Sequence, residues 1–139
     1  MFKSRQIFNF DFLFDDISNK YDIFDWESFN DKAKKYEVVA TDVITGESKF
    51  FDKNNCSDII SAVKASASMP VMSKMIDVEG RKYLDGGIST SIAYKRAFDV
   101  GYSKAIVVLT REEGYRKKPV NKINESIYKR YFKPLPNLV

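Results

Sequence analysis

Apolar and polar positions recur with two different periods along this chain, and the periods indicate both helices and strands. Segments of helical spacing are bounded by capping or terminating residues: Asp25 and Ser57 precede two of them, and Pro70 and Gly101 follow two. Other segments are rich in β-branched and aromatic residues, and two of these are divided by a Gly-containing turn, as in hairpins. We expect helices over residues 10–18, 26–34, 57–67, 90–99 and 120–132, and strands within residues 36–52, 74–85 and 104–111.

Two apolar runs do not alternate with polar residues, and they decide the expected fold class. Residues 38–40 and 105–109 are apolar at every position, which is typical of strands that are buried on both faces of a sheet. Strand, helix and strand follow one another along the chain, and this order predicts βαβ crossovers. We therefore expect an α/β fold with a mostly parallel central sheet flanked by helices.

Composition is that of a single globular domain. The 139 residues are 44% hydrophobic and 14% aromatic, with one cysteine, Cys56, and no histidine. A lone cysteine excludes an internal disulfide and fits a reducing compartment, and no apolar stretch is long enough for a signal peptide or a membrane span. We interpret Cys56 as structural and expect a cytoplasmic protein.

Charge is unevenly distributed around a net value of +4. Residues 1–31 hold three Lys/Arg and seven Asp/Glu, whereas residues 111–139 hold eight and three. A basic segment can attract an anionic membrane or nucleic acid, although most such segments are simply solvated. We expect no nucleic-acid partner. A non-catalytic module that binds lipid or another anion through Arg116, Lys117 and Lys118 stays open as an alternative function.

The absence of histidine narrows the possible chemistry. It excludes a Ser-His-Asp or Cys-His arrangement within these residues, together with the usual zinc signatures. Acid–base work falls to Asp, Glu, Lys or Tyr. The neighbours of Cys56 have no metal-ligand spacing, and we expect neither a metal nor a cofactor.

Asp85 stands at the carboxyl end of an expected strand and directly before two glycines, Gly86 and Gly87. Functional groups of parallel sheets collect at this end of the strands. Two adjacent glycines would let the backbone approach a reacting group closely while Asp85 presents a carboxylate. The alternative is a strand-to-helix turn with a capping aspartate, because Asp and Gly are ordinary turn formers. Spacing alone leaves both interpretations open.

Five motifs together resemble the patatin-like phospholipases, most closely a bacterial subgroup of that family. In order, they are VVATDVITGE, AVKASASMPV, YLDGGISTSI, AIVVLTR and GYRKKP, and the likeness runs from about residue 9 to residue 133. The resemblance implies a three-layer α/β fold and a Ser-Asp dyad that hydrolyses lipid acyl esters. It also implies that Asp85 is the carboxylate of the dyad, beside the motif glycines Gly86 and Gly87. A dyad needs no histidine, which agrees with the composition.

Two parts of that family's machinery are missing from residues 1–139. There is no G-x-S-x-G elbow to hold a nucleophile and no glycine-rich oxyanion loop, and neither Ser66 nor Ser68 stands in an elbow. The sequence therefore looks like the C-terminal half of a patatin-like domain, an incomplete fold that lacks the nucleophile. We expect the chain alone to be inactive, because both the covalent step and the oxyanion stabilisation are lost.

The resemblance also indicates partners. A complete domain would take a lipid or acyl-ester substrate and make transient contact with a membrane surface. A sheet without its other half exposes a strand edge, so we expect self-association or pairing with the missing N-terminal half. A structural piece that completes a separately encoded half of a split hydrolase is a further alternative.

Overall fold

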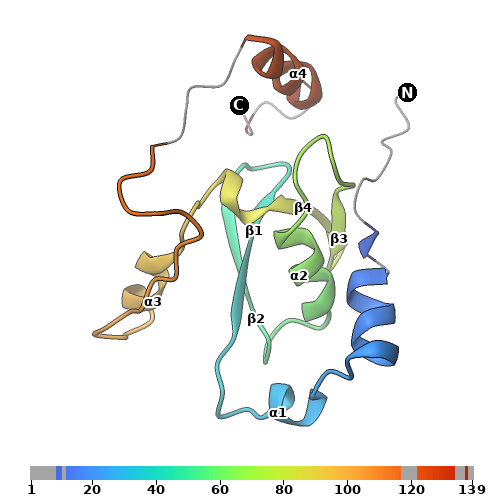
Figure 1. The fold of residues 1–139 in the computed structure, drawn as a ribbon, viewed down its shortest axis with the longest axis vertical. Helices are drawn as coiled ribbons and strands as arrows, with labels where there is room; N and C mark the ends of the chain where they lie inside the picture. Colours follow the sequence, from blue (N-terminus) through green and yellow to red (C-terminus); the bar gives the residue numbers. More distant parts are fainter. Residues whose placement is uncertain (1–8, 11, 117–121, 134–136, 138–139) are drawn as a thin grey trace.

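The computed structural model describes residues 9–10, 12–116, 122–133 and 137, and its centre is a four-stranded sheet (Figure 1). The strands lie in the order β2-β1-β4-β3, and every neighbouring pair is antiparallel. They are β1 (Glu37–Asp42), β2 (Ser48–Asp52), β3 (Ile76–Val78) and β4 (Arg81–Asp85). The expectation of a mostly parallel central sheet is therefore wrong, although strands and helices are combined as in the α/β class.

Two hairpins explain the antiparallel order. The chain turns from β1 to β2 through Gly46, at φ +75°, and from β3 to β4 through Glu79 and Gly80, at φ +53° and +80°. Positive φ values are those that tight hairpin turns require. β1 and β4 then pair in the middle of the sheet, with Ala40 opposite Asp85. Each hairpin places sequence neighbours side by side, so no adjacent strands are joined by the crossover helix of a parallel sheet.

Residues 104–111 do not form the buried strand that their apolar pattern predicts. Residues 104–109 have no regular secondary structure, and all of residues 104–111 are exposed. A β-prone segment becomes a strand when a neighbouring strand takes up its backbone hydrogen bonds. Within the described residues, the sheet offers this segment no such neighbour. The expectation of burial is therefore wrong for this run.

The helices lie near the expected positions. The three expected at 26–34, 57–67 and 90–99 are shorter in the structure, whereas the first runs over Phe12–Tyr21 and ends later than the expected 10–18. Asp25 caps one of them, as expected, by accepting the Ser28 N–H at 2.9 Å. Asp58 rather than Ser57 caps the next, because the N–H and hydroxyl of Ser57 donate to Glu79 instead. The elements are η1 (Phe12–Tyr21, a π-helix), α1 (Trp26–Asn30), α2 (Ile59–Ser66), η2 (Gly86–Ile88, a 3₁₀ turn), α3 (Tyr94–Asp99) and α4 (Lys122–Phe132).

Gly101 ends α3 as the sequence predicts. It has φ +98°, its N–H donates to the carbonyl of Phe98, and the N–H of Tyr102 donates to the carbonyl of Ala97, each at 3.0 Å. This pair of bonds is the Schellman motif, for which a glycine is favoured. The sequence pattern predicts the start of α3 too early, since residues 90–93 are not helical.

The main core lies between α2 and one face of the sheet. It consists of Ala40, Phe51, Ala62, Ala65, Val78 and Tyr83, all buried. A second cluster joins Val43, Leu84 and Phe132, so the end of α4 packs on the sheet as well. Figure 1 shows α2 lying across the strands, with α3 on the far side of β1 and β2.

Candidate functional site

Asp85 is held in place through its backbone, at the end of an inner strand. Its N–H donates to the carbonyl of Ser68 at 2.9 Å, and its carbonyl accepts the hydroxyl of Thr41 at 2.8 Å. Because Asp85 pairs with Ala40 of β1, its position is fixed from both neighbouring elements, β1 and the end of α2. The prediction that Asp85 stands at the carboxyl end of a strand is confirmed.

Asp85 is half-buried, and among the described residues its carboxylate accepts one hydrogen bond. Its Oδ1 accepts the Gly87 N–H at 2.7 Å, which caps the short 3₁₀ turn η2. Within the described residues, no serine or threonine hydroxyl donates to this carboxylate. Asp85 therefore does cap the turn that follows the strand, as the alternative interpretation of the sequence predicts. This capping uses only one of the two carboxylate oxygens. The second oxygen can still accept a hydrogen bond from an incoming hydroxyl.

Gly86 is required by close packing rather than by backbone conformation. A Cβ atom at this position would lie 2.4 Å from the carbonyl oxygen of Val39, a backbone atom of β1. At Gly87 the nearest contact would be 3.0 Å, to the Asp85 side chain. Neither glycine has a positive φ. The first glycine thus lets the chain pass tightly over β1, while the second leaves room for the carboxylate.

Four hydroxyl groups gather beyond the two glycines. Thr41 Oγ1 lies 2.8 Å from Ser89 Oγ, Ser48 Oγ donates to Ser89 Oγ at 2.9 Å, and Ser48 Oγ lies 2.5 Å from Thr90 Oγ1. Thr41 and Ser48 are paired across β1 and β2, so they point to the face of the sheet opposite Asp85. Sequence reasoning missed this cluster. The alternation along β1 was its available signal, because it places Thr41 and Ala40 on opposite faces.

The loop after α2, which contacts the Asp85 backbone, carries two irregularities. Val71 has φ +70°, a strained conformation for a β-branched residue. Ser73 is buried, and its hydroxyl has no hydrogen-bond partner among the described residues. Ser68 is also buried and donates to the carbonyl of Lys64 at 2.8 Å. Neither Ser68 nor Ser73 is presented to a substrate as a nucleophile must be.

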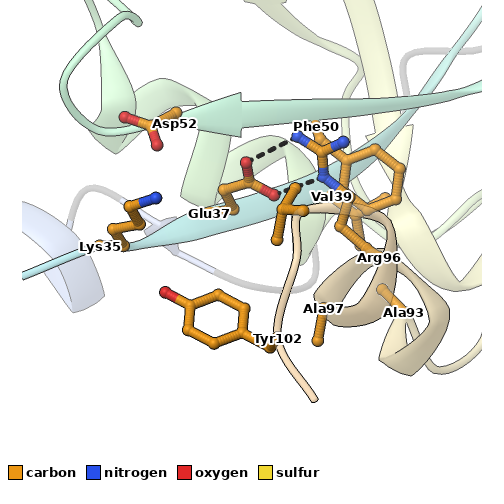
Figure 2. Close-up of a pocket in the computed structure, with 10 residues that line it drawn as sticks. Lys35, Glu37, Val39, Phe50, Asp52, Ala93, Arg96, Ala97 and Tyr102 are labelled. Carbon is orange, nitrogen blue, oxygen red and sulfur yellow. Dashed lines mark hydrogen bonds and ion pairs between the residues drawn. The ribbon is translucent and has the colours of Figure 1, made fainter. Parts of the chain in front are cut away.

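A cavity of about 320 Å³ lies on the other face, between α3 and strands β1 and β2 (Figure 2). Arg96 crosses it and donates two hydrogen bonds to Glu37, at 2.7 and 2.8 Å, while its guanidinium stacks 5.0 Å from the centre of the Phe50 ring. The hydrogen bond to Arg96 lowers the pKa of the Glu37 carboxyl, and the carboxylate raises the pKa of Arg96. The two charges neutralise each other, and Asp85 does not line this cavity.

The remaining candidates of the sequence contribute little to a site. Burial raises the pKa of the Cys56 thiol, which makes it a poor nucleophile at neutral pH and agrees with a structural role. Arg116 is exposed, whereas Lys117 and Lys118 lie outside the described residues. Among the residues that the structure describes, no group of His, Cys, Asp and Glu is arranged to hold a metal ion.

None of the helices in the described ranges is long and apolar enough to cross a bilayer.

Comparisons with known proteins identify no relative of this chain. No family model matches this chain, and neither the curated proteins nor the solved structures contain a match.

Proposed function

We propose that this chain supplies the dyad carboxylate, Asp85, of a patatin-like lipid acyl hydrolase whose serine nucleophile is provided by another polypeptide segment. The observation that carries the proposal is the state of the Asp85 carboxylate. Its backbone is fixed from β1 and α2, one oxygen is bound to Gly87 N–H, and the other oxygen has no described partner. The five motifs that resemble the family support the same assignment.

A carboxylate held in this way suits the chemistry of a Ser-Asp dyad. A serine hydroxyl at hydrogen-bond distance would donate to the free oxygen, which orients the hydroxyl and accepts its proton during attack on the ester carbonyl. The hydrogen bond from Gly87 holds the carboxylate in one orientation. The proposal includes that the chain by itself is inactive, and it is supported by the described serines, none of which donates to the Asp85 carboxylate.

The proposed setting is the cytoplasm, and the proposed substrate is a lipid acyl ester that is reached at a membrane surface. The lone, half-buried cysteine with its raised pKa fits a reducing compartment. The end of η1 and the link between η1 and α1 carry exposed Tyr21, Ile23 and Phe24, which are side chains of the kind that contact lipid interfaces. Both statements belong to the proposal about the complete enzyme.

Complementation tests the proposal directly. The chain is co-expressed with a half-domain of a patatin-like phospholipase that bears the G-x-S-x-G elbow and the oxyanion loop, and hydrolysis of a p-nitrophenyl acyl ester is measured. We expect no turnover by either half alone and turnover by the pair. Asp85→Asn should lower that turnover by roughly 10²–10⁴-fold.

A matched control separates catalysis from folding. Asp77 also binds a turn N–H through its carboxylate, at 3.0 Å to Gly80, and lies in the neighbouring strand. Asp77→Asn should leave complemented turnover within about twofold. Equal loss in both variants, or turnover that persists in Asp85→Asn, would contradict the assigned role. Turnover by the chain alone would contradict its inactivity.

A further inference from the structure

Thr41 is completely buried, and its hydroxyl binds both ends of the turn that follows Asp85. Its Oγ1 donates to the carbonyl of Asp85 at 2.8 Å and accepts the N–H of Ser89 at 3.3 Å. The 3₁₀ turn η2 lies between these two positions. A single side-chain atom therefore closes this turn against β1, which is an inner strand of the sheet.

The donor and the acceptor can be assigned in each contact of Thr41, because a hydroxyl carries one proton. The Thr41 proton goes to the Asp85 carbonyl, which can only accept a hydrogen bond. Ser89 must therefore donate to Thr41 across the 2.8 Å between their hydroxyl oxygens. The carbonyl of Gly86 also lies near the Ser89 hydroxyl, but at 3.5 Å it competes poorly for the proton.

Two further hydroxyls continue in the same direction. Ser48 Oγ donates to Ser89 Oγ at 2.9 Å, so Thr90 must be the donor in its 2.5 Å contact with Ser48. Thr90, Ser48, Ser89 and Thr41 thus form a series, the hydroxyl chain, in which every proton points toward the Asp85 carbonyl. Hydrogen bonds aligned in this way polarise and strengthen one another.

We propose that Thr41 is a positioning residue for the Asp85 carboxylate and that the hydroxyl chain supports it. This inference rests on the proposed function of Asp85. The N–H of Asp85 is bound to the Ser68 carbonyl and its carbonyl is bound to Thr41, so these two bonds fix the direction in which its side chain leaves the backbone. The bond from Ser89 to Thr41 keeps η2 closed, and within this turn the Gly87 N–H holds Oδ1 at 2.7 Å.

Amide hydrogen exchange in the isolated chain tests the positioning without any need for turnover. Thr41→Val keeps the shape of the side chain and removes the hydroxyl. We expect the Gly87 and Ser89 amides to exchange at least about fivefold faster, because the turn loses roughly the free energy of one hydrogen bond. Rates are compared with that of the Ala62 amide in α2, which reports on global opening. Thr41→Ser keeps the hydroxyl, so its rates should stay within about twofold of the parent.

Kinetics of the complemented pair test the consequence for catalysis, with the same half-domain and ester as above. Thr41→Val should lower kcat by about tenfold or more and leave KM within about twofold, because a misplaced base slows the chemical step and not substrate binding. Thr41→Ser should keep at least about half of kcat. Thr45→Val is the control, since it removes an exposed hydroxyl of the β1–β2 turn, and it should change neither constant.

Ser89→Ala tests the same contact from an exposed residue, where substitution leaves the fold intact. It removes the donor to Thr41 and should lower kcat by roughly threefold. This variant carries the test if circular dichroism shows that Thr41→Val does not fold. In that case, parent values of both Gly87 exchange and kcat in Ser89→Ala would overturn the proposal.

Three results with a folded Thr41→Val variant would also overturn the positioning role. They are Gly87 exchange that does not change relative to Ala62, a parental kcat in an active pair, and a Thr41→Ser variant that is as impaired as Thr41→Val. A parent pair without turnover would contradict the proposed function of Asp85. The exchange rates would then decide by themselves whether Thr41 holds the carboxylate.

Discussion

The two faces of the sheet are built from the same strands, yet they are covered in different ways. On one face, Ala40 and Phe51 pack against α2 in a closed apolar core. On the other face, Glu37, Val39 and Phe50 line a cavity that α3 only partly covers. Successive residues at 37–40 of β1 and 49–52 of β2 therefore alternate between the closed core and a partly covered surface. Strand alternation with a period of two produces this division directly.

The two faces differ in what they contribute: one holds most of the apolar core, and the other holds most of the described polar side-chain contacts. The α2 face holds the main apolar core, including the edge-to-face pair of Phe51 and Tyr83, whose ring centres are 5.1 Å apart. Leu84 is fully buried on the opposite face, where it packs with Val43 and Phe132. The α3 face holds the Arg96–Glu37 pair and the hydroxyl cluster around Ser89. Asp85 and its glycines stand where the chain crosses from the first face to the second. A candidate site at this crossing is anchored by the core and still open to a partner.

The largest expected effect comes from two adjacent phenylalanines on opposite faces. Phe51→Ala removes a ring that is 3% exposed and should lower the free energy of unfolding by about 3–5 kcal/mol. Phe50→Ala removes a half-buried ring beside Arg96 and should cost roughly 1–2 kcal/mol. Urea unfolding followed by circular dichroism measures both. Equal losses for the two variants would show that the faces contribute alike.

The sequence was a good guide to local structure and a poor one to strand pairing. Both hairpins were expected because Thr45-Gly46 and Glu79-Gly80 are turn signals within a few residues of the strands they join. The mostly parallel sheet was inferred from the apolar runs at 38–40 and 105–109. Such runs report that a segment is β-prone, while its partner is decided by residues far away in the sequence. For residues 105–109 that partner is absent from the described structure.

The candidate site shows the same limit. The place of Asp85 at a strand end follows from the pattern before it and the glycines after it. The reason for Gly86 is the carbonyl of Val39, which lies 47 positions earlier in the sequence and is brought near only by the β1–β4 pairing. The meeting of Thr41 and Ser48 with Ser89 depends on the same pairing. Contacts between distant segments are not visible in local patterns.

The crossing between the faces can be tested with its two glycines. Gly86→Ala places a Cβ atom against the backbone of β1, which cannot move without breaking strand pairing. The free energy of unfolding should therefore fall by about 1–3 kcal/mol. Gly87→Ala meets only the Asp85 side chain, and its stability should fall by less than about 1 kcal/mol. Thermal and urea unfolding of both variants provide the comparison. A Gly86→Ala variant as stable as the parent would remove the packing explanation for the first glycine.

The smallest expected effect concerns the ion pair of the open face and its dependence on pH. The hydrogen bond to Arg96 lowers the pKa of Glu37 below the ordinary value of 4.5, so the ionised carboxylate is favoured in the folded state. Its contribution to stability is complete above that value and is lost as the pH falls through the folded-state pKa. The difference in unfolding midpoint between the parent and Glu37→Gln should therefore be constant from about pH 7 to pH 5 and shrink toward pH 3. Added salt should also reduce this difference in unfolding midpoint, because the ion pair is partly exposed.

Glu47→Gln serves as the control. Glu47 is an exposed carboxylate in the β1–β2 turn, with no ion pair among the described residues. A difference that stays constant down to pH 3 would mean that Glu37 acts through its shape and not through its charge. The two faces of the sheet would then differ in how tightly they are packed, and not in whether charges stabilise them.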